Sequence, residues 1–156
     1  MNLKKKQQKG FSLIELLIVV AIILIIAAIA IPNLLRSKMA ANEASAVGSL
    51  RTINTSSVAY STTYGNYPQN LASLGPASGG NASSATADLI DAVLATGTKS
   101  GYTFTYTSAT PFQSYNITAS PTAQNTTGQR YFYTDQSGVI RANTAGAATS
   151  ASTPLS

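Results

Sequence analysis

The sequence predicts an α+β protein in which one long amino-terminal helix packs on an antiparallel sheet of three or four strands. An apolar run fills residues 11–31, and a helical repeat of small and apolar side chains continues to about residue 62. The carboxy-terminal half contains short segments in which aromatic and hydroxyl residues alternate, as in strands with one buried face. A chain of 156 residues, 44% hydrophobic and 10% charged, supports one modest domain.

The composition limits the chemistry that this protein can perform. Cys and His are absent, which excludes thiol catalysis, disulfides, a histidine general base and the usual zinc sites. The net charge is +5, but Lys4, Lys5, Lys6 and Lys9 provide four of these charges, and the remaining six basic and five acidic residues leave +1. We therefore predict no enzymatic activity, no cofactor and no metal, and nucleic-acid binding is not indicated.

The apolar run from Phe11 to Ile31 predicts a membrane-spanning helix. At 1.5 Å per residue its 21 residues span ~31 Å, which matches a bilayer core. The lysines before it place residues 1–10 in the cytoplasm and the chain after residue 31 outside. A secretory signal peptide cleaved after Ala30 is an alternative, but the run is longer than such segments usually are.

Glu15 is the informative residue of this run. Placing a carboxylate at membrane depth costs free energy, so its presence there indicates a functional role. The simpler alternative is that Glu15 reaches back to the nearby membrane surface.

The segment from Lys9 to Val20, KGFSLIELLIVV, resembles the processing motif of type IV prepilins and type II secretion pseudopilins. The resemblance implies that a membrane aspartyl peptidase cuts after Gly10, so that residues 1–10 are a leader peptide and Phe11 becomes a methylated amino terminus. Glycine suits such a site because its backbone can enter a protease cleft without side-chain obstruction.

The resemblance also implies assembly into a helical homo-oligomeric filament. In it, Glu15 would pair with the Phe11 ammonium of a neighbouring subunit and set the axial register; the alternative is a pair within one helix. The implied partners are the prepilin peptidase, an inner-membrane platform protein and an assembly ATPase, and the precursor would lie in the bacterial inner membrane before it joins a surface or periplasm-spanning filament.

Three other functions stay open at this point. The chain could be a type II secretion pseudopilin, an anchored domain that never polymerises, or a secreted binding protein released after Ala30. The sequence has neither the cysteines that close a loop in many pilins nor the acidic cluster with which the major pseudopilin often binds calcium.

Pro32 predicts a kink or local unwinding in one helix that runs from about Phe11 to about Thr62. Such a helix is ~75 Å long, too long for a domain of about 100 residues, so its first half would project. Its second half belongs to a globular head of residues 32–142. The stripe predicted to pack on the head consists of Leu35, Met39, Ala46, Leu50, Ile53, Ser57, Tyr60 and Tyr64.

The segment after the long helix predicts a turn, an exposed loop and a short helix. Gly65 and Pro68 suit the helix end, 76–85 is rich in Gly, Ser and Ala, and 86–95 has helical character. Asp88 and Asp91 would share one face of this short helix. We interpret them as complementing its dipole, because a calcium site needs more oxygen ligands than they provide.

Four strands are predicted, at 102–107, 114–119, 130–134 and 139–141, with the last two joined as a hairpin. Exposed tyrosines could stack on bases or sugars, but their alternation favours a core position. The residues from 143 to 156 lack periodicity and predict a disordered tail.

Overall fold

The computed structural model describes residues 10–155. The first nine residues of the predicted leader, with the lysines on which the cytoplasmic orientation depends, lie outside the described residues. The chain divides into two compact units, one ending at Arg36 and the other beginning at Ser37. Helix α1 (Leu13–Tyr64) contributes residues to both units.

Helix α1 begins two residues after the predicted start and ends two residues after the predicted end. It stops where Gly65 adopts a positive φ of 80°, a conformation that suits glycine, and the Gly65 amide donates to Ser61 O at 2.9 Å. Helical structure continues through Pro32, so the local unwinding does not occur. The kink at Pro32 stays a prediction.

The amino-terminal unit is a helix whose apolar side chains are exposed. Phe11, Ile18 and Ile25 are 83%, 54% and 64% exposed, and the other large apolar side chains as far as Leu35 are exposed as well. This part of α1 is long and apolar enough to cross a membrane, by length and composition.

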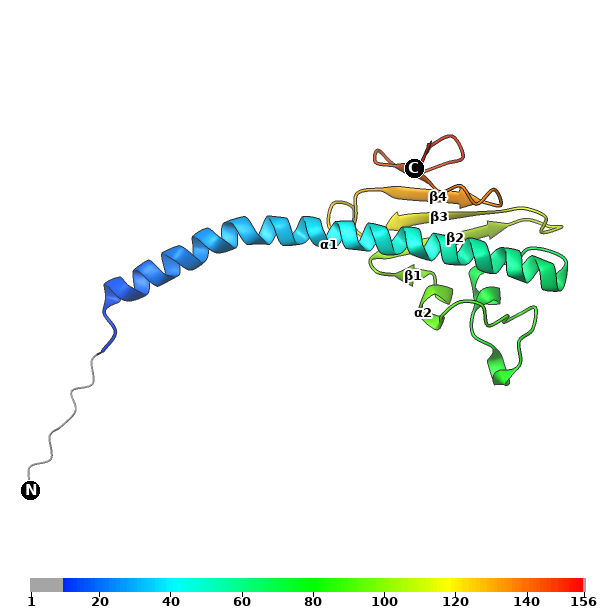
Figure 1. The fold of residues 1–156 in the computed structure, drawn as a ribbon, viewed down its shortest axis with the longest axis horizontal. Coiled ribbons are helices and arrows are strands. Elements are labelled where there is room, and N and C mark those ends of the chain that lie inside the picture. The colour runs from blue at the N-terminus through cyan, green and yellow to red at the C-terminus, as the bar shows by residue number, and fades with distance from the viewer. Residues whose placement is uncertain (1–9, 156) are drawn as a thin grey trace, which may run out of the picture. The chain divides into compact units, whose positions relative to one another are not determined.

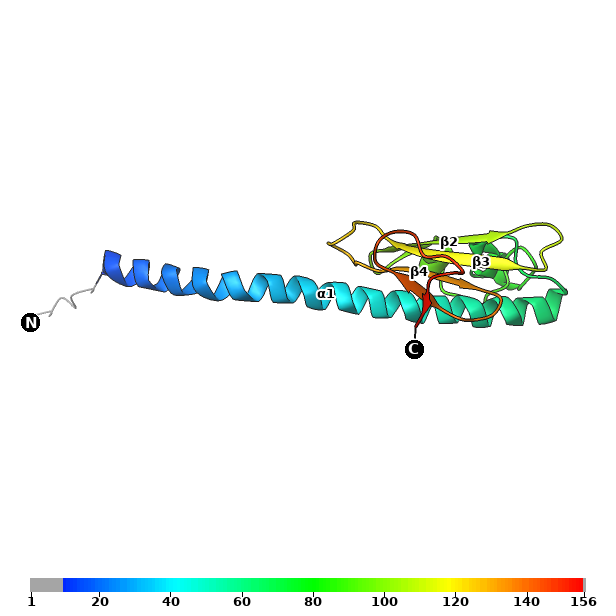
Figure 2. The same ribbon diagram turned by 90° about the horizontal axis from the view of Figure 1, so that it is seen from above.

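The carboxy-terminal unit is built on a six-stranded antiparallel sheet that lies against the second half of α1 (Figures 1 and 2). Each strand pairs with its neighbour in the chain, in the order β1 to β6. The strands are β1 (Thr98–Lys99), β2 (Tyr102–Ser108), β3 (Tyr115–Pro121), β4 (Tyr131–Asp135), β5 (Arg141–Asn143) and β6 (Thr153–Pro154). The antiparallel architecture is confirmed, with six strands in place of three or four, because β1 and β6 are two-residue strands that leave no pattern in a sequence.

The core of this unit forms between α1 and the sheet. Leu50 and Ile53 of α1 are completely buried, as are Ile117 of β3 and Phe132 of β4. The predicted helical stripe is confirmed from Met39 to Tyr60, with Tyr64 partly buried at its end. Leu35 is 40% exposed and belongs to the other unit.

The short helix is smaller than predicted. Residues 86–91 are not helical, and α2 contains only Ala92–Ala95. The reason is that this segment bonds to a 3₁₀ turn, η1 (Leu71–Leu74): its amides at positions 87 and 90 donate to Ser73 O and Leu74 O. Asp88 has a φ of 56°, so Asp88 and Asp91 do not share a helix face. The predicted loop 76–85 holds one 3₁₀ turn, η2 (Ser78–Gly80).

The tail is ordered where the sequence predicts disorder. Thr153 pairs with Ala142 of β5, the Leu155 amide donates to Ile140 O at 2.8 Å, and Ala148 is 3% exposed. A strand added to a sheet edge is held by backbone hydrogen bonds, which need no periodic side-chain pattern. That is why a segment of Ala, Ser, Thr and Gly can be ordered here.

Candidate functional site

At the start of α1, Glu15 provides one of the two hydrogen bonds of a capping box with Ser12. The Ser12 amide donates to Glu15 Oε2 at 2.8 Å, and Ser12 O accepts from the Leu16 amide at 3.2 Å. A carboxylate at the third helical position that reaches back to the preceding amide satisfies a donor that the helix itself cannot pair. The spacing Ser-x-x-Glu is visible in the sequence and could have predicted this contact.

This hydrogen bond gives Glu15 a local role that the sequence analysis did not consider. The carboxylate lies on an exposed part of the helix and uses Oε2 for the cap. In the described part of the chain, no hydrogen bond to Oε1 is found. One carboxylate can therefore hold the helix end and still accept a second donor.

The peptide bond between Gly10 and Phe11 precedes α1 and is exposed. A Cβ atom at Gly10 would meet no other atom within 4 Å, and the Phe11 side chain is 83% exposed. A larger residue at position 10 is therefore tolerated by the described structure, so an effect of such a change would arise at a partner that contacts the bond.

A second carboxylate, Glu43, was not singled out by the sequence analysis and is 8% exposed. Its Oε2 accepts from Arg130 Nε at 2.7 Å, and its Oε1 accepts from the Gln129 and Arg130 amides at 2.8 and 3.2 Å. Burial by itself raises the pKa of Glu43, but these hydrogen bonds and the charge of Arg130 outweigh it and hold the pKa below its usual value.

The contacts of Glu43 attach the segment between β3 and β4 to helix α1. Next to it, Asn42 Nδ2 donates to Thr127 O at 2.8 Å. Arg130 also lies 5.4 Å from the centre of the Phe132 ring, and its carbonyl accepts from the Tyr102 hydroxyl. The cluster is a structural connection within the head.

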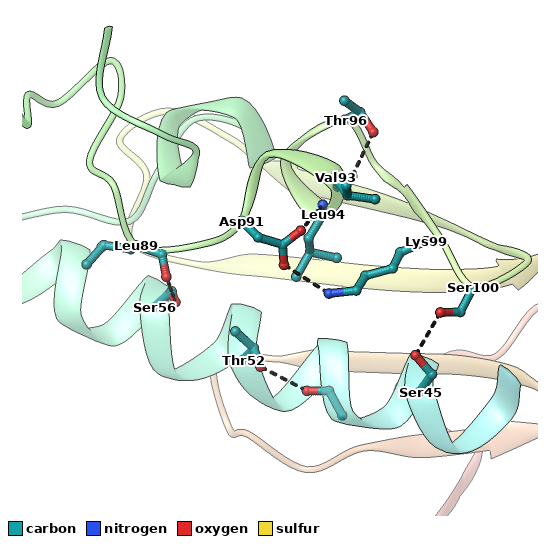
Figure 3. A network of polar contacts seen from close by, with 11 residues as sticks. Ser45, Thr52, Ser56, Leu89, Asp91, Val93, Leu94, Thr96, Lys99 and Ser100 are labelled. Atoms are coloured by element: carbon teal, nitrogen blue, oxygen red, sulfur yellow. Dashed lines mark hydrogen bonds and ion pairs between the residues drawn. The ribbon is translucent and has the colours of Figure 1, made fainter. Parts of the chain in front are cut away.

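Of the two aspartates considered for a metal site, Asp91 has other partners (Figure 3). Asp91 Oδ1 accepts from the Leu94 amide at 2.9 Å and caps α2, and Oδ2 pairs with Lys99 Nζ at 2.9 Å. This agrees with a role at a helix start. Among residues 10–155, no group of three or more acidic side chains is placed to hold a metal ion.

Two further contacts in Figure 3 connect α1 to the segment around α2 and β1. Ser56 Oγ donates to Leu89 O at 3.1 Å, and Ser45 Oγ donates to Ser100 Oγ at 2.9 Å. Hydroxyl side chains of α1 thus contribute to its seam with the head.

Comparison with known proteins supports the amino-terminal motif. Residues 5–31 match the family model described as the prokaryotic N-terminal methylation motif. The type IV wide pilus major component PilA4 of Thermus thermophilus is 60% identical over 38 residues, which cover 24% of this chain and 29% of that protein. No solved structure matches the chain. The amino-terminal part of this chain thus carries a methylation motif and an apolar helix, and it is similar to the corresponding segment of a type IV pilus component.

Proposed function

We propose that the protein is a structural subunit of a type IV pilus-like filament, cut after Gly10, methylated at Phe11 and polymerised through residues 11–31. The observation that carries this proposal is the combination of the methylation motif with an uninterrupted helix whose large apolar side chains are exposed as far as Leu35. Such a surface needs a partner. The bilayer covers this apolar surface before assembly, and the same helices of neighbouring subunits cover it afterwards.

Exchange between these two environments costs little, because lipid tails and apolar side chains solvate the helix about equally. Removal of the leader takes away Lys4, Lys5, Lys6 and Lys9, which hold the cytoplasmic end of the helix at the membrane surface. The processed helix can then leave the bilayer in contact with copies of itself. The accessible bond after Gly10 suits the peptidase that performs this step.

Cleavage also turns the Phe11 nitrogen into an ammonium group, which stays cationic after a single methylation. Inside a filament, an unpaired Glu15 carboxylate would be costly. With Oε2 on the Ser12 amide, Oε1 remains to accept the ammonium of a neighbouring subunit. Pairing between subunits therefore does not require the helix cap to break, and it fixes the register.

The partners in this proposal are the prepilin peptidase, an inner-membrane platform protein and an assembly ATPase, with the inner membrane as the first location and the cell surface as the last. A pilus is favoured over a secretion pseudopilus, because the relative that shares the amino-terminal segment is a pilus component.

The direct test is the intact mass and amino-terminal sequence of protein sheared from the cell surface. We expect sedimentable filaments whose subunits begin at Phe11 and carry one additional methyl group. Gly10→Val should leave the precursor uncut, because a side chain at this position would obstruct the peptidase cleft. The change meets no atom of the described structure, so the fold should be unaffected. A subunit that begins at Ile31 in free solution, or normal cleavage of Gly10→Val, would contradict the proposal.

Two variants separate the roles of Glu15. Glu15→Gln keeps an oxygen for the Ser12 amide but removes the charge, whereas Glu15→Ala removes both. If pairing with the Phe11 ammonium drives assembly, both variants are processed but form few filaments. Normal filament yield from Glu15→Gln would show that the helix cap is sufficient and would refute the pairing.

A further inference from the structure

An open cavity of about 720 Å³ lies in the head beside the carboxy-terminal end of α1. Its size falls in the range of small-molecule sites. It is independent of the apolar helix on which the proposed filament assembly depends. The residues that carry the following argument are Tyr64, Tyr67 and Phe112, with aromatic rings, and Asn66, Gln69 and Asn70, with amide side chains.

The wall of the cavity is held in place by contacts between segments distant in the sequence. The Tyr67 amide donates to Phe112 O at 2.9 Å, which attaches the β2–β3 loop to the segment after α1. Phe112 has a φ of 60°, a strained conformation for a bulky residue that the surrounding structure must maintain. Beneath them, the Tyr60 hydroxyl donates to Ser84 O at 2.7 Å.

The aromatic side chains of the cavity contact other rings and are partly accessible. The rings of Tyr60 and Tyr64 lie 4.6 Å apart, and Tyr67 packs edge-on against Tyr115 at 4.8 Å. Tyr64, Tyr67 and Phe112 are nevertheless only half-buried. The electron-rich faces of such rings attract the slightly positive C–H groups on one face of a sugar ring, in the same way that they attract ring edges.

The polar groups of the cavity are neutral. None of its lining residues carries a charge, so it offers no attraction to an ionic ligand. The side chains of Asn66 and Gln69 make no hydrogen bond to any described residue and lie at the cavity. An amide both donates and accepts, which matches the hydroxyl groups of a carbohydrate.

We propose that this cavity binds a neutral saccharide, with aromatic faces from α1 and the two loops against the sugar ring and the Asn66 and Gln69 amides on its hydroxyls. The lining combines aromatic rings with neutral polar side chains, and polar groups of this kind fix the orientation of a bound small molecule. A charged sugar would find no counter-ion here, so the preference is for uncharged rings.

Saturation-transfer NMR tests this proposal on the full processed chain in phosphatidylcholine nanodiscs, which avoids sugar-based detergents. The probes are lactose, maltose, mannose and N-acetylglucosamine, each alone. We expect transfer to at least one of them, weakened roughly tenfold in affinity by Tyr64→Ala, which removes one ring. Absence of transfer to all four sugars would overturn the proposal.

Because Tyr64 also contacts the core, a second variant protects the test against loss of folding. Asn66→Ala combined with Gln69→Ala removes side chains without hydrogen bonds to the described residues, so the head should remain folded. This variant should bind the sugar several-fold more weakly, whereas Gln136→Ala, a change of an exposed amide in the β4–β5 turn, should bind it normally. Equal binding of the sugar by the unchanged protein, the double variant and Gln136→Ala would refute the site.

Discussion

Glu43 offers the sharpest test of how the head is held together. Among the described residues it is the only charged side chain that is buried, and it accepts three hydrogen bonds from the segment before β4. Glu43→Ala removes all three. Glu43→Gln keeps an oxygen for the Gln129 and Arg130 amides but removes the charge that faces the Arg130 guanidinium.

The expected loss of stability follows from the groups that each substitution leaves without a hydrogen-bond partner. In Glu43→Ala the two amides lose their acceptor in a partly buried place, at a cost of about 1 kcal/mol each. The Arg130 side chain is 40% exposed, so water can replace the lost carboxylate and the further penalty is small. We expect the free energy of unfolding to fall by about 2–3 kcal/mol for Glu43→Ala and about 1 kcal/mol for Glu43→Gln.

Thermal unfolding of the head can be followed by near-UV circular dichroism of its tyrosines, with the full chain in lipid nanodiscs. For a unit of this size, the larger change corresponds to a decrease of roughly 6–12 °C in Tm. Lys99→Met is the control, because its pair with Asp91 is exposed and worth at most about 1 kcal/mol. If Glu43→Ala melts within about 2 °C of the unchanged protein, the seam does not depend on this carboxylate.

The contribution of Glu43 to the stability of the head should also depend on pH. The pKa of Glu43 is held below its usual value in the folded protein, so its contribution is fully present above the pKa of the unfolded chain. It is lost as the pH falls through the folded pKa. The difference in Tm between the unchanged protein and Glu43→Gln should therefore be constant from about pH 6 to 8 and shrink below about pH 4.5. A difference that grows on acidification would refute this assignment.

Three further predictions use the same unfolding measurement. The Tyr106 hydroxyl is buried without a hydrogen-bond partner among the described residues, so Tyr106→Phe should leave stability unchanged or raise it. Tyr115→Phe loses the hydrogen bond that the Tyr115 hydroxyl donates to Asn54 Oδ1 and should cost about 1 kcal/mol; the reverse order would contradict the structure. A chain ending at Asn143 lacks β6 and the buried alanine of the tail and should melt several degrees lower, while an unchanged Tm would restore the predicted disorder. Asp91→Ala removes the cap of α2 and should cost about 1 kcal/mol, more than Lys99→Met; equal effects would mean that the ion pair, and not the cap, is what stabilises the helix end.

The elements that the sequence predicted are those with a long periodic pattern. The stripe of α1 and the alternation in β2 each contain several repeats, so helix and strand could be distinguished. The helix predicted at 86–95 forms only at Ala92–Ala95, because backbone amides at positions 87 and 90 donate to carbonyls of η1, and local periodicity does not report such tertiary hydrogen bonds. Strand β6 was not predicted, for the related reason that an edge strand is defined by its partner strand and not by its own side chains.

The site residues divide in the same way between local and distant determinants. Gly10, Phe11 and Glu15 are recognisable because their roles are implied by a contiguous motif, and the cap on Ser12 is encoded within four residues. Glu43 occupies the position between Met39 and Ala46 at which the apolar stripe is interrupted, so its burial was implied by the helical spacing. A buried carboxylate requires donors from elsewhere.

The sequence could not identify those donors, because Arg130 lies 87 residues away and four other basic residues of the carboxy-terminal unit compete as candidates. The hydrogen bonds from the Gln129 and Arg130 amides are independent of side-chain identity altogether. The choice of partner is therefore made by the path of the chain between β3 and β4. The same pairing that fixes this path also explains why the head keeps a carboxylate in its seam: apolar side chains could fill the space, but only an acceptor can satisfy the two amides that face α1.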